Sequence, residues 1–332
     1  MTINYDVLLE NLRDVFWAMD QEGNILYINE ICHELLGYHP KEVLGKPLFE
    51  IMCPRHEYRV GSCVRLVEQM KVRDFHKEKL WMLHSNGETR VVLELNSRRI
   101  EGASGALEIH GLGRDITERI ALEKANKQAS LNALKALVAA VEAKDVYTQG
   151  HSLRVAQYAQ TLGKCLNLTQ DQLEELDMAS MLHDIGKIGI NDAILTKSGI
   201  LTSDEYAMIK EHPVIGGRIV SAAGFSRDII NAVMYHHRHY DGHGYPLGLD
   251  MVGDNTIVCI ISVADAFDAM TSRRSYKPIL KRQQVIDEFL SQSSKQFCPR
   301  VVTALIKALT ETDAFDGCVL KGDDDLAHYP LG

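Results

Sequence analysis

Histidines are concentrated in the second half of the chain, where they occupy positions that a helical core would normally fill. Seven of the 14 histidines fall between residues 151 and 243. His151 opens the helically spaced apolar series Val155, Tyr158, and His183 continues a similar stripe. Each buried polar group without a partner costs about 1–3 kcal/mol. The chain must therefore fold so that these imidazoles find a common partner.

Carboxylates share the same predicted inward faces. Asp184 follows His183 directly, and Asp265 lies four residues after Ile261 on an apolar helix face. A further helix is expected to end at His212, because Pro213 follows it. We expect seven side chains to converge as a metal site: His151, His183, Asp184, His212, His236, His237 and Asp265.

The donor set of this predicted site contains nitrogen and oxygen but no thiolate. Such a set favours Fe, Mn or another borderline first-row ion over a structural zinc site. Asp184 is the natural bridging ligand, and two ions about 3.5–4 Å apart suit the hydrolysis of a phosphate ester. For any one histidine, a core residue bonded to a carbonyl is the ordinary alternative, and convergence of the whole set argues against it.

Residues 11–115 show a different, mixed α/β pattern. Two short apolar runs, Val15–Met19 and Ile25–Ile28, flank the turn Asp20–Gly23 and predict a hairpin. A short helix is expected around residues 29–36, and strand-like stretches follow at 78–84, 90–99 and 106–114.

This first region resembles the PAS sensory family. The resemblance rests on VFWAMDQEGNILYINEICHELLGYHPKEVLGKPLFEIM (15–52) and GRDITER (113–119), about a third of the chain. It implies a sensory domain without identifying its ligand. The cysteine motif of photoactive flavin-binding members is absent, and haem ligation by His56 or His76 is an open, weaker alternative.

The segment between the two regions predicts one helix. Residues 116–143 contain no Gly or Pro and are rich in helix formers. Apolar residues near heptad spacing favour a coiled coil, whereas Glu123 and Lys127 within that seam favour a solvated connecting helix. Both interpretations stay open, and the coiled coil implies a homodimer formed through the PAS domain and this helix.

The second region resembles the HD-GYP family of HD-superfamily phosphohydrolases over about half of the chain. Five ordered stretches carry the resemblance: AKDVYTQGHSLRVA (143–156), MLHDIGKIGI (181–190), EHPVIG (211–216), HHRHYDGHGYP (236–246) and ISVADAFDAMTSRRSYKP (261–278). Known members hydrolyse cyclic di-GMP. The resemblance implies a first metal held by His151, His183, Asp184 and Asp265, and a second held by Asp184, His212, His236 and His237.

The same resemblance implies further site residues. Lys187 matches the lysine that contacts the scissile phosphate, so Lys187 and Asp184 are the expected catalytic residues. The expected substrate contacts are Lys187, Arg274, Lys277, Tyr245 and Asp268.

Four positions depart from the family pattern: Tyr240 replaces the usual Trp, His243 stands where a small residue is common, and the other two bear on the metals. Tyr147 stands where members with a third metal carry a Glu, so we expect two metals, and Arg238 replaces a usual Glu beside the second metal. Such a charge reversal puts the surroundings of the metal in doubt, but not the ligands.

The sequence thus predicts an α+β protein of four parts. These are a PAS domain of α/β type (1–115), a connecting helix (116–143), an all-α HD-GYP domain (144–315) and a loose tail (316–332). The expected activity is hydrolysis of cyclic di-GMP to linear pGpG or GMP under PAS control. The alternatives are action on another cyclic dinucleotide such as cyclic GMP-AMP, a generic HD nucleotidase, or a catalytically silent binding or recruitment module.

Net charge, hydropathy and cysteine usage restrict what the protein binds and where it acts. The net charge of −9 argues against binding to polymeric nucleic acid, and no apolar run is long enough for a membrane span. The absence of a signal peptide and seven scattered cysteines, without CxxC spacing, favour a cytoplasmic protein without a disulfide framework. A diguanylate cyclase bound through the GYP loop is a further expected partner.

Overall fold

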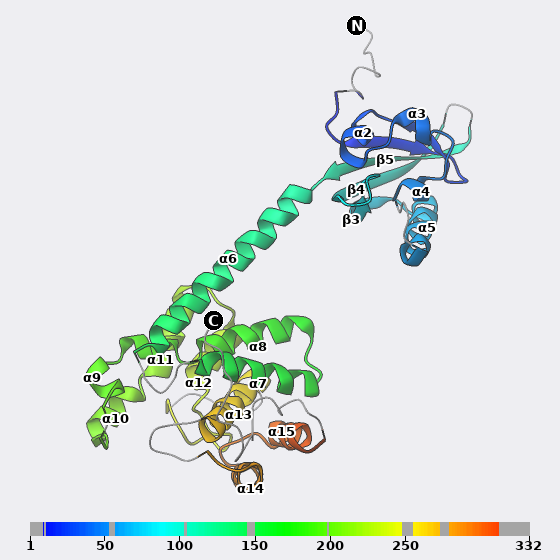
Figure 1. Cartoon of the computed structure of the whole chain (residues 1–332). Helices are drawn as coiled ribbons and strands as arrows, with labels where there is room; N and C mark the ends of the chain where they lie inside the picture. The colour runs from blue at the N-terminus through cyan, green and yellow to red at the C-terminus, as the bar shows by residue number, and fades with distance from the viewer. Residues whose placement is uncertain are drawn as a thin grey trace, which may run out of the picture. The chain divides into compact units, whose positions relative to one another are not determined.

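The computed structural model divides the chain into two compact units, Met1–Ser130 and Leu131–Gly332 (Figure 1). The division falls inside the connecting helix rather than at either end of it. The structure describes residues 9, 11–52, 57–102, 105–144, 150–197, 199–247, 255–272 and 279–311.

A five-stranded antiparallel sheet forms the centre of the first unit (Figure 1). Its strands are ordered β2-β1-β5-β4-β3, so the first hairpin and the last three strands meet where β1 pairs with β5. The strands are β1 (Val15–Met19), β2 (Ile25–Ile28), β3 (Phe75–Leu83), β4 (Arg90–Glu101) and β5 (Leu107–Asp115). The predicted hairpin is confirmed residue for residue.

The turn of that hairpin depends on two local features. Asp20 accepts a hydrogen bond from the backbone N–H of Asn24 through its Oδ1 at 2.8 Å, and Gly23 adopts a φ of +96° that glycine tolerates best. Four helices lie between β2 and β3: α2 (Ile31–Leu36), α3 (Pro40–Val43), α4 (Leu48–Met52) and α5 (Glu57–Val72).

The interior of the first unit is apolar. A small pocket there is lined by aliphatic, aromatic and methionine side chains, among them Trp17, Met70 and Leu95. His76 is exposed on β3, so it does not reach this interior as a haem ligand would. His56 lies outside the described residues.

Helix α6 (Thr117–Glu142) is the predicted connecting helix. Its residues from Leu131 onward belong to the second unit, where Val138 and Val141 are buried in the core. Leu122 and Leu137 are exposed on α6.

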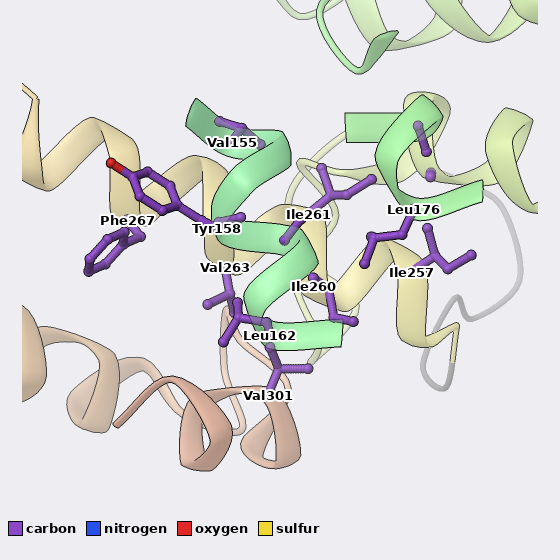
Figure 2. Packing of buried hydrophobic residues seen from close by; sticks show 14 of the residues in the cluster. Val155, Tyr158, Leu162, Leu176, Ile257, Ile260, Ile261, Val263, Phe267 and Val301 are labelled. Atoms are coloured by element: carbon purple, nitrogen blue, oxygen red, sulfur yellow. The ribbon is translucent and has the colours of Figure 1, made fainter. Parts of the chain in front are cut away.

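The second unit is built from helices around α13 (Thr256–Thr271), most of whose residues are apolar. Ile260, Ile261 and Phe267 of α13 are fully buried, and α7 (His151–Cys165) packs along it. Figure 2 shows Tyr158 and Leu162 of α7 within this cluster, and the Tyr158 ring meets Phe267 edge-on with centroids 4.9 Å apart. Burying such side chains contributes about 1.5–3 kcal/mol each to folding. This packing stabilises the helices that carry the site.

Shorter elements surround these two helices. They are α8 (Gln170–Leu182), η1 (Ile185–Gly189), α9 (Asp192–Leu195), α10 (Ser203–Ile209), α11 (His212–Ala222), α12 (Arg227–Tyr235), α14 (Arg282–Gln292) and α15 (Pro299–Glu311). The α+β fold class predicted from the sequence is therefore confirmed, with a sheet-based first unit and a helical second one.

The cysteines differ in part from the expectation. Cys32, Cys165, Cys259 and Cys298 are not in disulfides, but Cys63 is disulfide-bonded. The sequence favoured cysteines without a disulfide framework, and it gave no sign of the bond at Cys63, because spacing does not reveal pairs without a CxxC pattern. Among the described residues, every helix is too short or too polar to cross a membrane.

Candidate metal centre

The predicted ligands stand at the ends of helices, apart from one in the middle of α13. His151 is the first residue of α7 and His212 the first of α11. His183 and His236 directly follow α8 and α12. The sequence predicted that a helix would end at His212; instead α10 ends at Ile209 and a new helix begins at His212, with Pro213 in the first turn where proline is well tolerated.

The first group of side chains comprises His151, His183 and Asp265. The Nε2 atoms of His151 and His183 are 3.3 Å apart, and His151 Nε2 lies 3.2 Å from Asp265 Oδ1. Three donor atoms of this group fall within 4.8 Å of one another, a spacing that fits one shared ion.

The second group comprises His212, His236 and His237, again with donor atoms within 4.8 Å of one another. The Nε2 atoms of His212 and His236 are 3.4 Å apart. The rings of His236 and His237 lie with centroids 4.1 Å apart. His212 and His236 are 1% exposed, whereas His237 lies at the edge of the site.

Asp184 lies between the two groups, with one oxygen turned to each. Its Oδ1 is 3.2 Å from His212 Nε2. Its Oδ2 is 3.6 Å from His183 Nε2 and 3.8 Å from His151 Nε2. Asp184 therefore lies between the two groups, with one carboxylate oxygen facing each.

Three of the histidines are oriented by the helix that precedes them. The Nδ1 atoms of His183, His212 and His236 lie 2.7, 2.7 and 2.9 Å from the carbonyl oxygens of Ser180, Ile209 and Val233, three residues earlier. These carbonyls belong to the last turn of α8, α10 and α12, where no backbone N–H is available to them. A carbonyl only accepts, so each Nδ1 carries a proton and each ring points its Nε2 atom into the site.

This orientation supports a fit to metal ions. The Nε2 atoms of His212 and His236 face each other at 3.4 Å. Burial lowers the pKa of His236 well below its usual value, so that ring is neutral. A divalent cation would take both nitrogens as donors, and imidazole with carboxylate is a common donor set for first-row ions. The residues present therefore fit the two divalent ions that the sequence predicts.

The charges of the site also fit bound cations. Burial alone would raise the pKa of Asp184, but Lys187, His183 and His212 outweigh it and hold that pKa well below its usual range. Burial alone would also lower the pKa of His151, yet hydrogen bonds to Asp265 and Asp268 raise it to about 10. The carboxylates around His151 thus attract positive charge to this group of side chains.

Asp268 lies behind the first group rather than in an open substrate site. It is 1% exposed, and its Oδ2 is 2.7 Å from His151 Nδ1. Arg154 donates to both its oxygens, from Nε at 2.7 Å and from Nη2 at 3.0 Å. This placement does not fit the substrate contact expected of Asp268, because a buried carboxylate with both oxygens engaged cannot receive a ligand. Its position suits a residue that orients His151.

Lys187 lies on the open side of Asp184. Its Nζ is 2.8 Å from Asp184 Oδ2, and 15% of its side chain is exposed. The lysine cation therefore lies beside the carboxylate that faces both donor groups. Arg274 and Lys277 are outside the described residues, so their expected role as substrate contacts stays a prediction.

The GYP loop folds back onto the second group. The N–H of Tyr245 donates to the carbonyl of His237 at 3.3 Å, and the two rings lie with centroids 4.8 Å apart. Gly244 has a φ of +83°, and a Cβ there would overlap the carbonyl oxygen of His237. Arg238, the unexpected residue beside the metal ligands, donates through Nη1 to the carbonyl of Pro246 at 2.6 Å and so helps to hold this loop.

Two residues that the sequence interpretation did not single out also shape the site. Arg154 pairs with Asp268. Its position about one helical turn after His151 could have indicated from the sequence that it lies near the site. Gly186 follows Asp184 by two residues, and a Cβ there would overlap the backbone carbonyl of His212. Only glycine therefore lets η1 approach the start of α11 closely enough to bring Asp184 to His212.

Family comparison defines the class of this helical unit. A family model described as HD domain matches residues 135–301, half of the chain, and the chain belongs to that family. A second model, described as PAS domain, matches residues 13–118. The chain thus joins a PAS domain to an HD domain of HD-GYP type, as the sequence motifs implied.

Curated relatives resemble the chain over the helical unit. A cyclic di-GMP phosphodiesterase of Thermotoga maritima is 37% identical over 56% of this chain and 51% of its own length. A cyclic di-GMP phosphodiesterase response regulator of Xanthomonas campestris is 34% identical over 55% and 49%. A 3'3'-cGAMP-specific phosphodiesterase of Vibrio cholerae is 33% identical over 60% and 39%. The chain spans about half the length, or less, of these relatives.

Proposed function

We propose that the chain is a metal-dependent phosphodiesterase that hydrolyses cyclic di-GMP to linear pGpG or onward to GMP, under control of its PAS domain. The observation that carries this proposal is the convergence of two three-residue donor groups on the two oxygens of Asp184. Lys187 beside that carboxylate adds a cation for the phosphate. Relatives named as cyclic di-GMP phosphodiesterases support the substrate.

The proposed reaction adds one water across a P–O3′ bond and leaves a 5′-phosphate and a 3′-hydroxyl. Two bound divalent ions, Fe or Mn, would activate that water and stabilise the oxygens of the displacement. His151, His183, Asp184 and Asp265 would hold one ion, and Asp184, His212, His236 and His237 the other. Lys187 would stabilise the charge that develops on the phosphoryl oxygens. Tyr245, Arg274 and Lys277 would bind the substrate.

Partners of the chain are part of the proposal. Exposed Leu122 and Leu137 on α6 fit a homodimer formed through this helix and the PAS domain. A diguanylate cyclase bound through the GYP loop fits a loop of which Leu247, at its end, is 78% exposed.

Action on cyclic GMP-AMP is the second candidate, because a relative is named as specific for 3'3'-cGAMP. A substrate panel separates the candidates. The purified chain is incubated anaerobically with Fe²⁺ or Mn²⁺ and each cyclic dinucleotide, and the products are separated by chromatography. Faster conversion of cyclic di-GMP to pGpG is expected. Preferential conversion of cyclic GMP-AMP would transfer the activity to that substrate.

A catalytically silent binding module is the third candidate, and it fits the site less well. Such a module has no need of seven intact ligands, yet none of the seven is missing here. Tight binding of cyclic di-GMP without turnover, in a chain shown to contain its metals, would favour it. Activity on mononucleotides alone would instead indicate a generic HD nucleotidase.

A further inference from the structure

The N-terminus of α7, where His151 lies, is capped from another helix. The N-cap residue is Gly150, which has no side chain to accept from the free N–H groups of the first turn. Glu142, the last residue of α6, supplies the acceptors instead. Its Oε2 accepts from Gly150 N–H at 2.8 Å and its Oε1 from Ser152 N–H at 2.7 Å.

These two bonds lie on either side of His151 in the backbone. The carboxylate also faces the positive end of the α7 dipole, where a negative charge is favourable. His151 is held at its ring by Asp268 and at its backbone by Glu142. Both constraints act on the same ligand of the first group, and neither acts on the second group.

The end of α6 also contacts the segment that carries Asp184 and Lys187. Lys144 donates through Nζ to the carbonyl of Ile188 at 3.2 Å and pairs with Asp192 at 2.9 Å. A pocket lies between these contacts, lined by Val138, Val141, Glu142, Ser152, Met181, Asp184, Ile185 and Lys187. The last turns of α6 therefore form one wall of the region beside the metal centre.

We propose that Glu142 is a positioning residue that fixes His151 for the first metal, so that the end of α6 controls occupancy of that metal. This inference rests on the proposed metal centre but not on the identity of the substrate. Because α6 begins at Thr117, within the segment matched by the PAS family model, a shift of α6 would act first on the ion held by His151.

Titration of the full-length, metal-free chain with Mn²⁺ tests this. The wild type is expected to bind two ions. In Glu142→Ala, one ion should bind as in the wild type and the other about 10–100-fold more weakly, the usual effect of losing a residue that orients a ligand. Glu142→Gln keeps only one acceptor oxygen and should lie between the two. Glu123→Ala, an exposed change on the same helix, should bind as the wild type does.

A second background assigns the weakened ion. His212→Ala removes a ligand of the second group, so the ion that remains is the one held by His151. Adding Glu142→Ala to it should weaken this remaining ion by the same factor. Unchanged binding of both ions in Glu142→Ala, or equal weakening of both, would overturn the positioning role. A wild type that binds no ions would instead overturn the proposed metal centre itself.

Discussion

Replacing Asp184 with alanine is expected to reduce hydrolysis of cyclic di-GMP by more than about 1,000-fold, beyond the loss of a single stabilising donor. The reason is that this one carboxylate faces both donor groups, with Oδ1 3.2 Å from His212 and Oδ2 3.6 Å from His183. Its removal should lower the affinity for both ions. The measurement is kcat with cyclic di-GMP, together with the metal content of the variant after gel filtration.

The fold should survive this change, because Asp184 contributes nothing to the apolar core beneath the site. The melting temperature of the metal-free variant, compared with the metal-free wild type, checks that point. Asp184→Asn preserves the volume and gives the same test if the alanine variant is unstable. Asp171→Ala, an exposed aspartate on α8, serves as the control and should retain full activity. Full activity in Asp184→Ala would contradict a shared bridging carboxylate.

Replacing Lys187 with methionine is expected to lower kcat about 100–1,000-fold, the range measured when a donor to a transition-state oxyanion is removed. Its Nζ lies beside Asp184 and outside both donor groups. The variant should therefore keep two ions. An interaction made only in the transition state lowers kcat and kcat/KM equally, so KM should stay close to that of the wild type.

The same kinetics distinguish other roles of Lys187. A raised KM with unchanged kcat would show that the lysine only binds substrate. A loss of metal would show that it acts by holding Asp184 in place. Lys164→Met, an exposed change on α7, provides a control that should leave kcat, KM and metal content unaltered.

The sequence predicted that these side chains would converge because of their chemistry. Burying histidines and aspartates without hydrogen-bond or metal partners costs free energy. That cost alone predicted their convergence, without knowledge of the detailed geometry. The hairpin of β1 and β2 was also predictable, since apolar alternation and a glycine turn are local signals. Family motifs then added Lys187, which periodicity alone did not distinguish from a solvated lysine.

Other features depend on contacts between distant parts of the chain and could not be predicted. His183 was expected to continue a helical stripe, yet α8 ends at Leu182 and the His183 ring donates to a carbonyl of its last turn. Asp268 was expected at the substrate, whereas Arg154 and His151 engage it inside the core. The sequence did not reveal that Glu142 caps α7, because it precedes the start of α7 by nine residues and lies on another helix.

The most direct measurement is the number of metal ions per chain. The purified chain is loaded anaerobically with Fe²⁺ or Mn²⁺, freed of excess metal by gel filtration and analysed for metal and protein. Two ions per chain are expected from two donor groups that share Asp184. One ion or none, or a stoichiometric three, would contradict the binuclear centre.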